Sequence, residues 1–425
     1  MNVAGIDAKH IVVIGGGVVG IACALELQDH GHCVTVLEPG LPGEGASWAS
    51  CGSIAVSEVV PLSKPGLLAR VPGWLLDPVG PLAMRPSALV SQIPWFVRFA
   101  TNARPARIDA IAKEISSLSA LALEDTKDLL VRLGLTELVG TRPIIELYDT
   151  AEERAHERPY HDKRRALGFA IRDISGAEAH EMEPAIASDF ACAAVMDDWR
   201  SIKDPKGFVA ALHKAFVTRG GTVRTMAATG FDRTGTRVIA VRDATGNRVE
   251  ADEVIIAAGI ASRALAAGIG IKLRMEGVIG YQTSLTDPGV EVLHGLIYAK
   301  GGFGITPYES GLAVAGSIEF ARPGAAPDWR RADTLVQKAR RVLPGLKTET
   351  GEKRIGRRPL TPDTKPIIGR AQDVENVVFA TGHGQLGITL AATTARFVRQ
   401  IISTDRPNVD LTPFSPDRFK AGVFV

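Results

Sequence analysis

The sequence is poor in the residues that cross-link small folds or anchor a chain in a membrane. Its 425 residues include four cysteines and 6% aromatic residues. The cysteines lie far apart, without the C-x-x-C spacing of redox or zinc sites, and are Cys23, Cys33, Cys51 and Cys192. No run reaches the roughly 18 apolar residues that cross a bilayer. These absences exclude a disulfide framework and favour a reducing compartment.

Neither sign of charge dominates either. The chain has 49 Lys and Arg against 47 Asp and Glu, a net charge of +2, which gives no field that would attract nucleic acid. With 45% hydrophobic and 23% charged residues, it can form one large or two interleaved domains. Residues 1–9 lack the basic and apolar pattern of a signal peptide, so we expect a cytoplasmic protein.

The sequence does contain a complete dinucleotide-binding unit at residues 11–38. An apolar run at 11–14 leads into Gly15, Gly17 and Gly20, which open an amphipathic helix. A second strand at 34–37 ends at Glu38, about 20 residues beyond the glycines, where a carboxylate can accept hydrogen bonds from a ribose. The glycines permit a tight turn, the approach of a pyrophosphate and close helix packing. Nicotinamide and flavin enzymes share this unit, so it does not identify the dinucleotide.

The rest of the chain alternates helical and strand patterns. Helices are predicted at 108–133, 151–165, 208–218 and 328–342, and strands at 144–148, 238–241 and 251–259. Residues 273–318 alternate in the manner of an antiparallel sheet. His156, Glu157 and His161 do not have the spacing of a helical zinc site, so no metal is predicted. The sequence predicts an α/β fold, with a Rossmann-like domain interleaved with an antiparallel-sheet domain.

Residues 67–100 combine apolar, aromatic and basic side chains, a composition typical of an interfacial or lid segment. The residues concerned are Trp74, Leu75, Leu76, Leu82, Met84, Trp95, Phe96 and Phe99, with Arg70, Arg85 and Arg98 between them. Prolines at 65, 72, 78, 81, 86 and 94 argue against a long amphipathic helix. We therefore favour a loop-rich buried connection, and leave peripheral contact with the inner face of the cytoplasmic membrane as the alternative.

A second glycine turn lies near the end of the chain. The buried run at 377–380 leads into Gly382, Gly384 and Gly387, which open another helix. Backbone N–H groups at a helix start suit an electron-rich oxygen, such as the pyrimidine carbonyl of a reduced flavin. A nicotinamide has no such anionic reduced form, so this turn favours a flavin.

At these motifs the chain resembles the flavin-dependent family of D-amino-acid oxidases, glycine oxidases and, most closely, bacterial D-amino-acid dehydrogenases. The matching segments are the first glycine motif, Gly45-Ala46-Ser47 before Gly52, Gly280-Tyr281, G-x-R-P-x-T-P-D at 356–363 and T-G-H-G-x-x-G at 381–387. They follow the family's order over nearly the whole chain.

The resemblance implies an extended FAD, its ADP half on the first glycine turn and Glu38, and its isoalloxazine between residues 47–52 and 383–387. The implied FAD residues are Gly15, Gly17, Val18, Val19, Gly20, Glu38, Ser47, Gly52, Ala258, Gly259, Gly382, His383, Gly384, Leu386, Gly387 and Thr389. We expect an FAD-binding domain at 9–66, 180–268 and 350–425, and a substrate domain with lid and helical segments at 67–179 and 269–349.

The family's G-x-R-P arginine falls on Arg358, which the resemblance implies clamps a substrate carboxylate; a guanidinium can make two charge-assisted bonds to it. Arg357 should face the opposite side, toward the surface. Tyr281 and Tyr298 are candidates either for substrate contact or for core packing. Ser50-Cys51 departs from the relatives' Asn-Ala, and for Cys51 a small buried cysteine is favoured over a flavin-linked thiol.

The resemblance implies oxidative deamination of D-amino acids. Hydride passes from Cα to flavin N5, no strong protein base is needed, and the imino acid then hydrolyses. The segment 197–205 favours a small or cyclic substrate such as D-proline or cis-4-hydroxy-D-proline, the substrate of hydroxyproline degradation. Electrons would pass to a quinone, another respiratory carrier or oxygen. The alternatives are a nicotinamide-dependent dehydrogenase, an amine, glycine or sarcosine-type oxidase, and an electron-transfer subunit of a larger complex.

Overall fold

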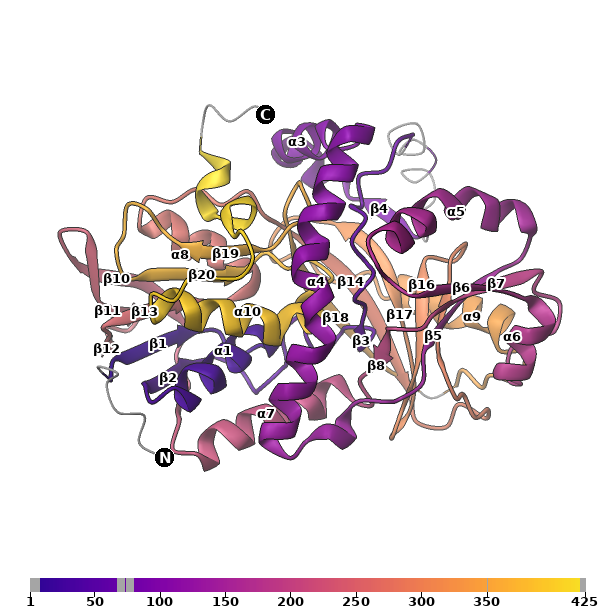
Figure 1. Cartoon of the computed structure of the whole chain (residues 1–425), viewed down its shortest axis with the longest axis horizontal. Coiled ribbons are helices and arrows are strands. Elements are labelled where there is room, and N and C mark those ends of the chain that lie inside the picture. Colours follow the sequence, from indigo (N-terminus) through magenta and orange to yellow (C-terminus); the bar gives the residue numbers. More distant parts are fainter. Residues whose placement is uncertain (1–7, 67–72, 74–79, 350, 421–425) are drawn as a thin grey trace.

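A parallel sheet and a larger, mostly antiparallel sheet lie side by side in the computed structural model (Figure 1), which describes residues 8–66, 73, 80–349 and 351–420. The parallel sheet has the order β19 (Ile367–Arg370), β20 (Val377–Thr381), β13 (Glu253–Ile256), β1 (His10–Ile14), β2 (Cys33–Leu37), β9 (Thr222–Arg224). Only β19, at one edge, runs antiparallel to its neighbour. The prediction of an α/β fold with a Rossmann-like part is confirmed.

Both faces of the parallel sheet are covered because its strands are apolar on both sides. Ile11 and Val13 face a core formed with α1 (Val18–Asp29), α4 (Pro105–Leu133), α7 (Pro205–Thr218) and α10 (Gly387–Ile402). Val12 and Ile14 face a second core, which includes residues of α8 (Ser262–Gly268) and of the small sheet β10 (Ala228–Thr234), β11 (Arg237–Asp243), β12 (Arg248–Glu250).

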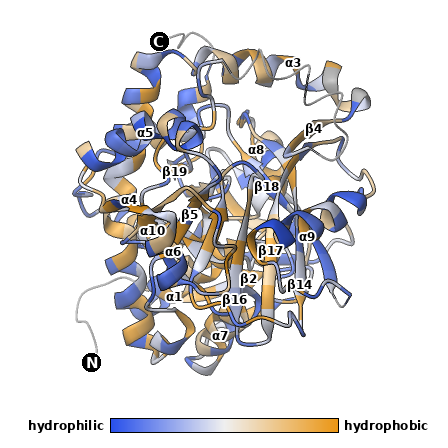
Figure 2. Ribbon diagram, turned by 90° about the vertical axis from the view of Figure 1, so that its right-hand side faces the viewer, coloured by the Kyte–Doolittle hydropathy of each residue, from blue (hydrophilic) through white to orange (hydrophobic). Residues whose placement is uncertain are grey.

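The large sheet has the order β18 (Glu352–Leu360), β14 (Glu276–Leu285), β17 (Gly311–Phe320), β16 (Phe303–Tyr308), β15 (Gly295–Tyr298), β5 (Ile144–Tyr148), β7 (Cys192–Met196), β6 (Ile171–Ser175), with β4 (Leu82–Met84) also pairing with β17. Helices α9 (Arg330–Val342) and α6 (Gly176–Met182) cover its outer face, where they share a core with the strands. In Figure 2, α9 is largely hydrophilic while the strands beneath it are hydrophobic.

The remaining described elements are short or lie at the edges of these layers. They are α3 (Pro86–Thr101), α5 (Ala151–Ala166), the strand pair β3 (Ser53–Ile54) and β8 (Arg200–Ser201), and the 3-10 turns Thr136–Leu138, Gly259–Ala261, Thr412–Phe414 and Pro416–Phe419. Among the described residues, no helix combines the length and apolar character that a membrane span requires.

The antiparallel sheet predicted at 273–318 forms, but it is larger than predicted. Two of its strands, β7 and β18, lie in ranges that we assigned to the FAD-binding domain, yet they pair with β5 and β14 of the large sheet. Long-range hydrogen bonding, which local pattern does not encode, decides their place. The domain boundaries themselves stay a prediction.

The segment 67–100 is partly helical, which corrects the argument from its prolines. Residues 67–72 and 74–79, with Trp74, Leu75 and Leu76, lie outside the described residues. The helix α3 begins at a proline, which the first turn tolerates, and continues through Pro94. Packing compensates for the lost hydrogen bond, since Trp95 and Phe99 are buried against the large sheet.

Candidate active site

A cavity of about 920 Å³ lies at the carboxyl ends of β1, β2, β13 and β20, where it reaches across to the large sheet. Its volume is near the upper end of the roughly 300–1,000 Å³ of cofactor and ligand sites, and its place is the one that open α/β sheets use for ligands. Of the predicted FAD residues, those that line it are Gly15, Gly17, Val18, Val19, Glu38, Ser47, Gly52, Ala258, Gly259, His383, Gly384, Leu386 and Gly387.

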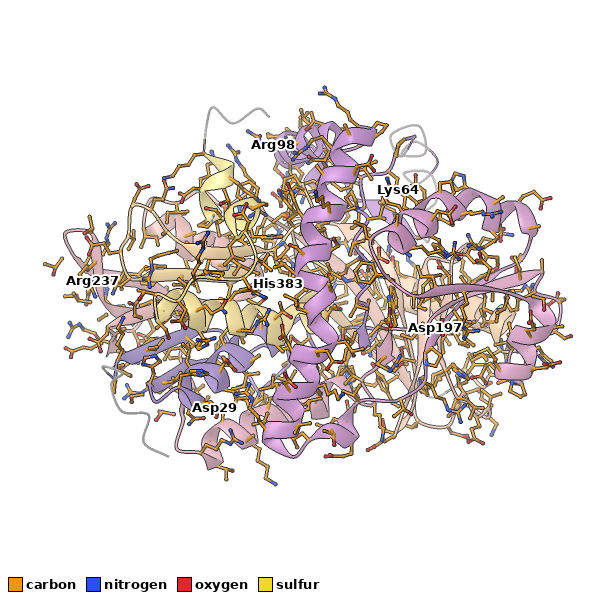
Figure 3. The ribbon with its side chains drawn as sticks, in the orientation of Figure 1. Asp29, Lys64, Arg98, Asp197, Arg237 and His383 are labelled. Carbon is orange, nitrogen blue, oxygen red and sulfur yellow. The ribbon has the colours of Figure 1, made fainter. Side chains whose placement is uncertain are left out.

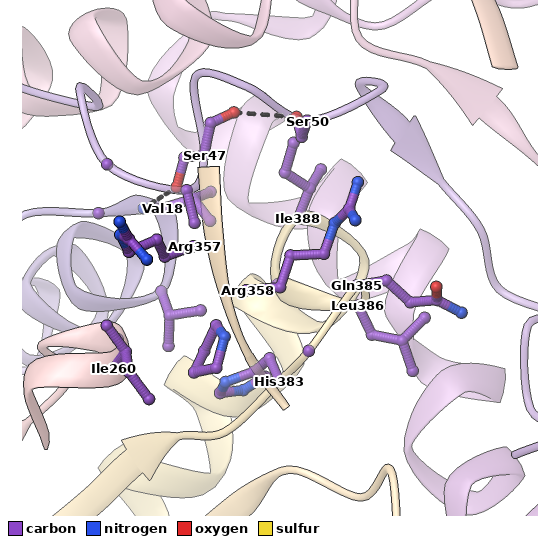
Figure 4. Close-up of a pocket in the computed structure, with 18 of the residues that line it drawn as sticks. Val18, Ser47, Ser50, Ile260, Arg357, Arg358, His383, Gln385, Leu386 and Ile388 are labelled. Carbon is purple, nitrogen blue, oxygen red and sulfur yellow. Dashed lines mark hydrogen bonds between the residues drawn. The ribbon is translucent and has the colours of Figure 1, made fainter. Parts of the chain in front are cut away.

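The first glycine turn is shaped by close backbone packing. Gly15 has a φ of +104°, and a Cβ at Gly20 would lie 1.9 Å from the Gly15 carbonyl oxygen. Gly17 is different, because the nearest atom to its Cβ would be Ser47 Oγ at 3.6 Å. That hydroxyl accepts a hydrogen bond from the N–H of Val18 (Figure 4). Gly20 therefore packs the helix behind the cavity, whereas Gly17 leaves room for a phosphate group.

Glu38 and an unpredicted histidine hold the same turn. The Glu38 carboxylate accepts hydrogen bonds from the N–H groups of Gly16, at 2.6 Å, and Gly40, at 3.1 Å. Its contact with a ribose stays a prediction. From α7, the buried His213 donates from Nε2 to the Gly16 carbonyl oxygen at 2.7 Å, and burial lowers the pKa of His213. A lone histidine on an apolar helix face carries no sequence signal for this role.

The second glycine turn leads from β20 into α10. Gly382 and Gly384 have φ values of +71° and +56°. The first N–H groups of α10 have no acceptor within the helix, and Gly387 and Ile388 line the cavity, so this wall favours an electron-rich ligand atom. Gly382 and Thr389 lie behind the wall, and Thr389 Oγ1 accepts from the N–H of Ala55 at 2.9 Å.

His383 lies between these glycines (Figure 3). It is 4% exposed, its Nε2 lies 2.9 Å from Thr394 Oγ1, and burial lowers the pKa of its imidazole from 6.5 to about 3. An imidazole held neutral supplies no positive charge at physiological pH. The favourable electrostatics of this wall therefore come from the backbone N–H groups of α10.

The same pKa shift predicts an acid-sensitive fold. Between pH 6.5 and about 3, His383 is protonated in the unfolded chain but neutral in the folded chain. The free energy of unfolding therefore falls as the pH falls. The loss is about 1.4 kcal/mol per pH unit, or about 5 kcal/mol over the interval. His383→Gln should reduce this slope in urea unfolding between pH 7 and 5. Equal slopes in the variant and the unaltered protein would contradict the assignment.

Arg358 reaches the cavity from β18, where it pairs with Val278 of β14. Its guanidinium lies over Gly280, since a Cβ there would be 2.4 Å from the guanidinium carbon. Nη1 donates to the Ser317 carbonyl oxygen at 3.0 Å. Burial lowers the pKa of Arg358, against a smaller opposing effect of Cys51, and among the described residues no carboxylate pairs with it. The site thus holds a half-buried guanidinium that can accept an anionic partner.

Arg357 points to the other side of β18 (Figure 4), as strand alternation predicts, but it does not reach the outer surface. It is half-buried, lines the cavity and donates from Nη2 to the Ala325 carbonyl oxygen at 3.0 Å. The surface assignment is wrong because this part of β18, although on an edge strand, borders the cavity, which both Arg357 and Arg358 line.

The two candidate tyrosines differ in position. Tyr281 is fully buried outside the cavity lining; its hydroxyl donates to Glu319 at 2.5 Å and accepts from the N–H of Asp328, and burial raises its pKa to about 12. Tyr281 therefore packs the core, which corrects its candidacy for the site. Tyr298 does line the cavity, and its hydroxyl donates to Asp149 Oδ2 at 2.6 Å.

Cys51 lies under the large sheet beside Arg358. A Cβ at Gly304 would be 2.6 Å from its sulfur, which contacts Thr306 Oγ1 at 3.3 Å. Burial raises the pKa of the Cys51 thiol. Cys51 is nevertheless only half-buried and lines the cavity, so the structure does not confirm the buried cysteine that the sequence favoured.

A polar wall that the sequence did not predict closes the far side of the cavity. Its lining carboxylates are paired: Glu58 with Arg164 at 2.7 Å, Glu157 with Lys64 at 2.8 Å and Glu146 with His161 at 3.1 Å. His161, considered above as a metal ligand, thus contacts the Glu146 carboxylate through Nε2. Of the segment 197–205, Trp199 lines the cavity, whereas Asp197 pairs with Arg172 on the surface.

Known proteins match this chain over nearly its whole length. A model of the family described as DAO, FAD-dependent oxidoreductase, matches residues 10–401. A D-amino-acid oxidase of Bradyrhizobium diazoefficiens is 30% identical over 97% of this chain and 99% of its own length. A D-amino acid dehydrogenase 2 of Ralstonia nicotianae is 30% identical over 95% of this chain and 99% of its own.

Solved structures share the fold. Glycine oxidase from Geobacillus kaustophilus superposes with a TM-score of 0.76 at 20% identity, covering 97% of this chain and 99% of its own. L-proline dehydrogenase from P. horikoshii gives 0.72 at 17% identity, covering 97% and 98%.

The residues present fit FAD. The glycine turn leaves space at Gly17, Glu38 offers a carboxylate, and the cavity continues to the N-terminus of α10 and to Arg358. The predicted cofactor and the prediction of a flavin-dependent oxidoreductase are confirmed. From its matching family model, its full-length relatives and the site just described, the chain belongs to the DAO family of FAD-dependent oxidoreductases.

Proposed function

We propose that this protein oxidatively deaminates D-amino acids, with Arg358 binding the substrate carboxylate. The observation that carries the proposal is the half-buried Arg358 guanidinium, which lines the cavity with no carboxylate partner among the described residues. The D configuration is supported by the full-length relatives named D-amino-acid oxidase and D-amino acid dehydrogenase. Family membership makes FAD the hydride acceptor.

The chain's own residues supply orientation. Two N–H groups of Arg358 fix the carboxylate, and the small residues Gly304 and Ala315 line the cavity beside it. FAD, when bound, would supply the acceptor for the hydride that leaves Cα. No carboxylate or imidazole of the described cavity is required as a base, since an amine that enters neutral loses its proton to solvent after oxidation. Addition of water to the imino acid then gives a 2-oxo acid and ammonia.

The test is anaerobic mixing of the holoenzyme with D- and L-amino acids while the flavin's visible absorbance is followed. Bleaching by D-isomers alone is expected, and bleaching by L-isomers or by none would overturn the proposal.

Including D-proline and cis-4-hydroxy-D-proline tests the narrower proposal that Trp199 favours a small or cyclic side chain. Reoxidation by a soluble quinone faster than by air would establish a dehydrogenase, the acceptor class that we propose.

We further propose that α3 contacts an anionic membrane surface where such an acceptor resides. Its outward residues Val90, Ile93 and Val97 are 76%, 48% and 58% exposed and lie at helical spacing. Burial is the main cause of the lowered pKa of Arg274. The nearby positive charge of Arg98, on the same helix (Figure 3), lowers the pKa of Arg274 further. An apolar stripe beside arginines complements an anionic lipid surface.

Ile93→Asp with Val97→Asp should therefore release the protein from phosphatidylglycerol vesicles. Each lost apolar contact is worth about 1.5 kcal/mol, so a decrease in binding of at least 10-fold is expected in a sedimentation assay. Val131→Asp, which changes a 60% exposed valine on α4, is the matched control and should bind as the unaltered protein does. Absence of vesicle binding by the unaltered protein would contradict the proposal.

A further inference from the structure

A β-bulge in β17 lies directly opposite Gly280. Strands β14 and β17 are in register at Ile279 with Glu319, and register resumes at Tyr281 with Gly316. Two residues of β17, Ser317 and Ile318, therefore oppose the one residue Gly280. Bulges re-aim backbone and side chains next to active sites, and this one lies beneath the Arg358 guanidinium.

Ser317 has an unusual backbone for a strand residue. Its φ is +61°, in the left-handed region that residues other than glycine seldom adopt. This conformation turns its carbonyl oxygen toward Arg358, which donates to it from Nη1 at 3.0 Å. Apart from this bond, the Arg358 guanidinium makes no hydrogen bond or ion pair with the described part of the chain. The Ser317 carbonyl is thus the polar contact that orients the guanidinium.

The side chain of Ser317 is held in turn by Arg331 of α9. Arg331 is 1% exposed and donates from Nη1 to Ser317 Oγ at 2.7 Å and to the Gly80 carbonyl oxygen at 3.0 Å. The bulge is also the point at which β17 changes partner, from β16 at Gly316 to β4 at Ile318. Arg331 therefore fastens the bulge to both α9 and the segment that leads into β4.

We propose that Ser317 and Arg331 are positioning residues for Arg358, an inference that rests on the proposed carboxylate clamp. Gly280 supplies the space for the guanidinium, and the Ser317 carbonyl takes one N–H of Nη1, which fixes the rotation of the guanidinium plane. The N–H groups of Nε and Nη2 stay available for a carboxylate. Bidentate binding tolerates only small angular error, so a loosened bulge weakens substrate binding before it affects the fold.

Two substitutions at Ser317 separate positioning from stability. Ser317→Ala and Ser317→Gly both remove the hydroxyl that Arg331 binds, but only glycine adopts a φ of +61° without strain. We expect Ser317→Gly to be the more stable variant and yet to show the larger increase in KM for a D-amino acid, about 10-fold, with kcat nearly unchanged. A purely structural role would make the more stable variant bind better.

A double-mutant cycle with Arg358→Ala completes the test. The probes are the D-amino acid that bleaches the flavin fastest and the corresponding amine, which lacks the carboxylate. In the enzyme that keeps Arg358, Ser317→Gly should lower the ratio of kcat/KM for the D-amino acid to kcat/KM for the amine. In the enzyme that carries Arg358→Ala, it should leave this ratio unchanged. Equal effects on both backgrounds, or unchanged KM in Ser317→Gly, would overturn the inference. If Arg358→Ala itself keeps the preference, the proposed clamp fails instead.

Discussion

Arg358→Ala should retain FAD and lose D-amino-acid turnover. The guanidinium is the cation proposed to meet the substrate carboxylate, and loss of a charge-assisted pair in a cavity costs about 2–5 kcal/mol, which corresponds to a decrease of roughly 30- to 5,000-fold in kcat/KM. Arg358→Lys keeps the charge without the planar fork, so we expect it to recover only part of the activity. Steady-state kinetics with visible absorbance for bound flavin measures both properties.

Arg354→Ala is the matched control for that prediction. Arg354 is on the same strand and faces the same side as Arg358, but it pairs with Glu352 and stacks on Trp48 instead of lining the cavity. Its loss should leave kcat/KM within a few-fold of the unaltered enzyme. If Arg358→Ala retained full turnover and substrate affinity, the carboxylate would have to bind elsewhere in the cavity.

Substitutions of two glycines in the first turn should have opposite consequences. Gly20→Ala would place a methyl group 1.9 Å from the Gly15 carbonyl oxygen, a backbone atom that cannot move without separating α1 from β1. We expect a loss of about 3 kcal/mol or more, a large fraction of the usual 5–15 kcal/mol, and therefore a protein that folds poorly and contains little FAD.

Gly17→Ala should fold normally, because its Cβ meets nothing closer than Ser47 Oγ at 3.6 Å and its φ of −67° suits alanine. The methyl group would occupy the space left for the pyrophosphate, so FAD affinity should fall by about 10-fold or more. Thermal unfolding of the apoproteins separates the two effects. Equal apoprotein stability in both variants would refute this division of roles.

Features defined by short stretches of sequence could be predicted, and features defined by distant partners could not. The first turn is encoded within 28 residues, so its strand, glycines, helix and acidic end were predictable in order. Alternation along β18 also predicted that Arg357 and Arg358 face opposite sides. Whether each face meets solvent, however, depends on the parallel sheet across the cavity, whose strands come from both ends and the middle of the chain.

Dependence on distant partners also explains why the role of Tyr281 and the bulge in β17 could not be predicted. Tyr281 lies next to Gly280, yet it points to the opposite face and meets Glu319, a residue aligned with its strand by pairing alone. The left-handed Ser317 has no glycine or asparagine signature, because its conformation is imposed by strand exchange and by Arg331. Local sequence cannot indicate either contact.

The order of strands in the parallel sheet also bears on synthesis of the protein. Strand β13 lies between β1, from the start of the chain, and β20, from its last fifth, and α10 packs against α1. During translation the first glycine turn therefore emerges hundreds of residues before the strand and helix that complete its sheet and the opposite wall of its cavity. The cofactor site therefore stays incomplete and exposed until nearly the whole polypeptide has left the ribosome.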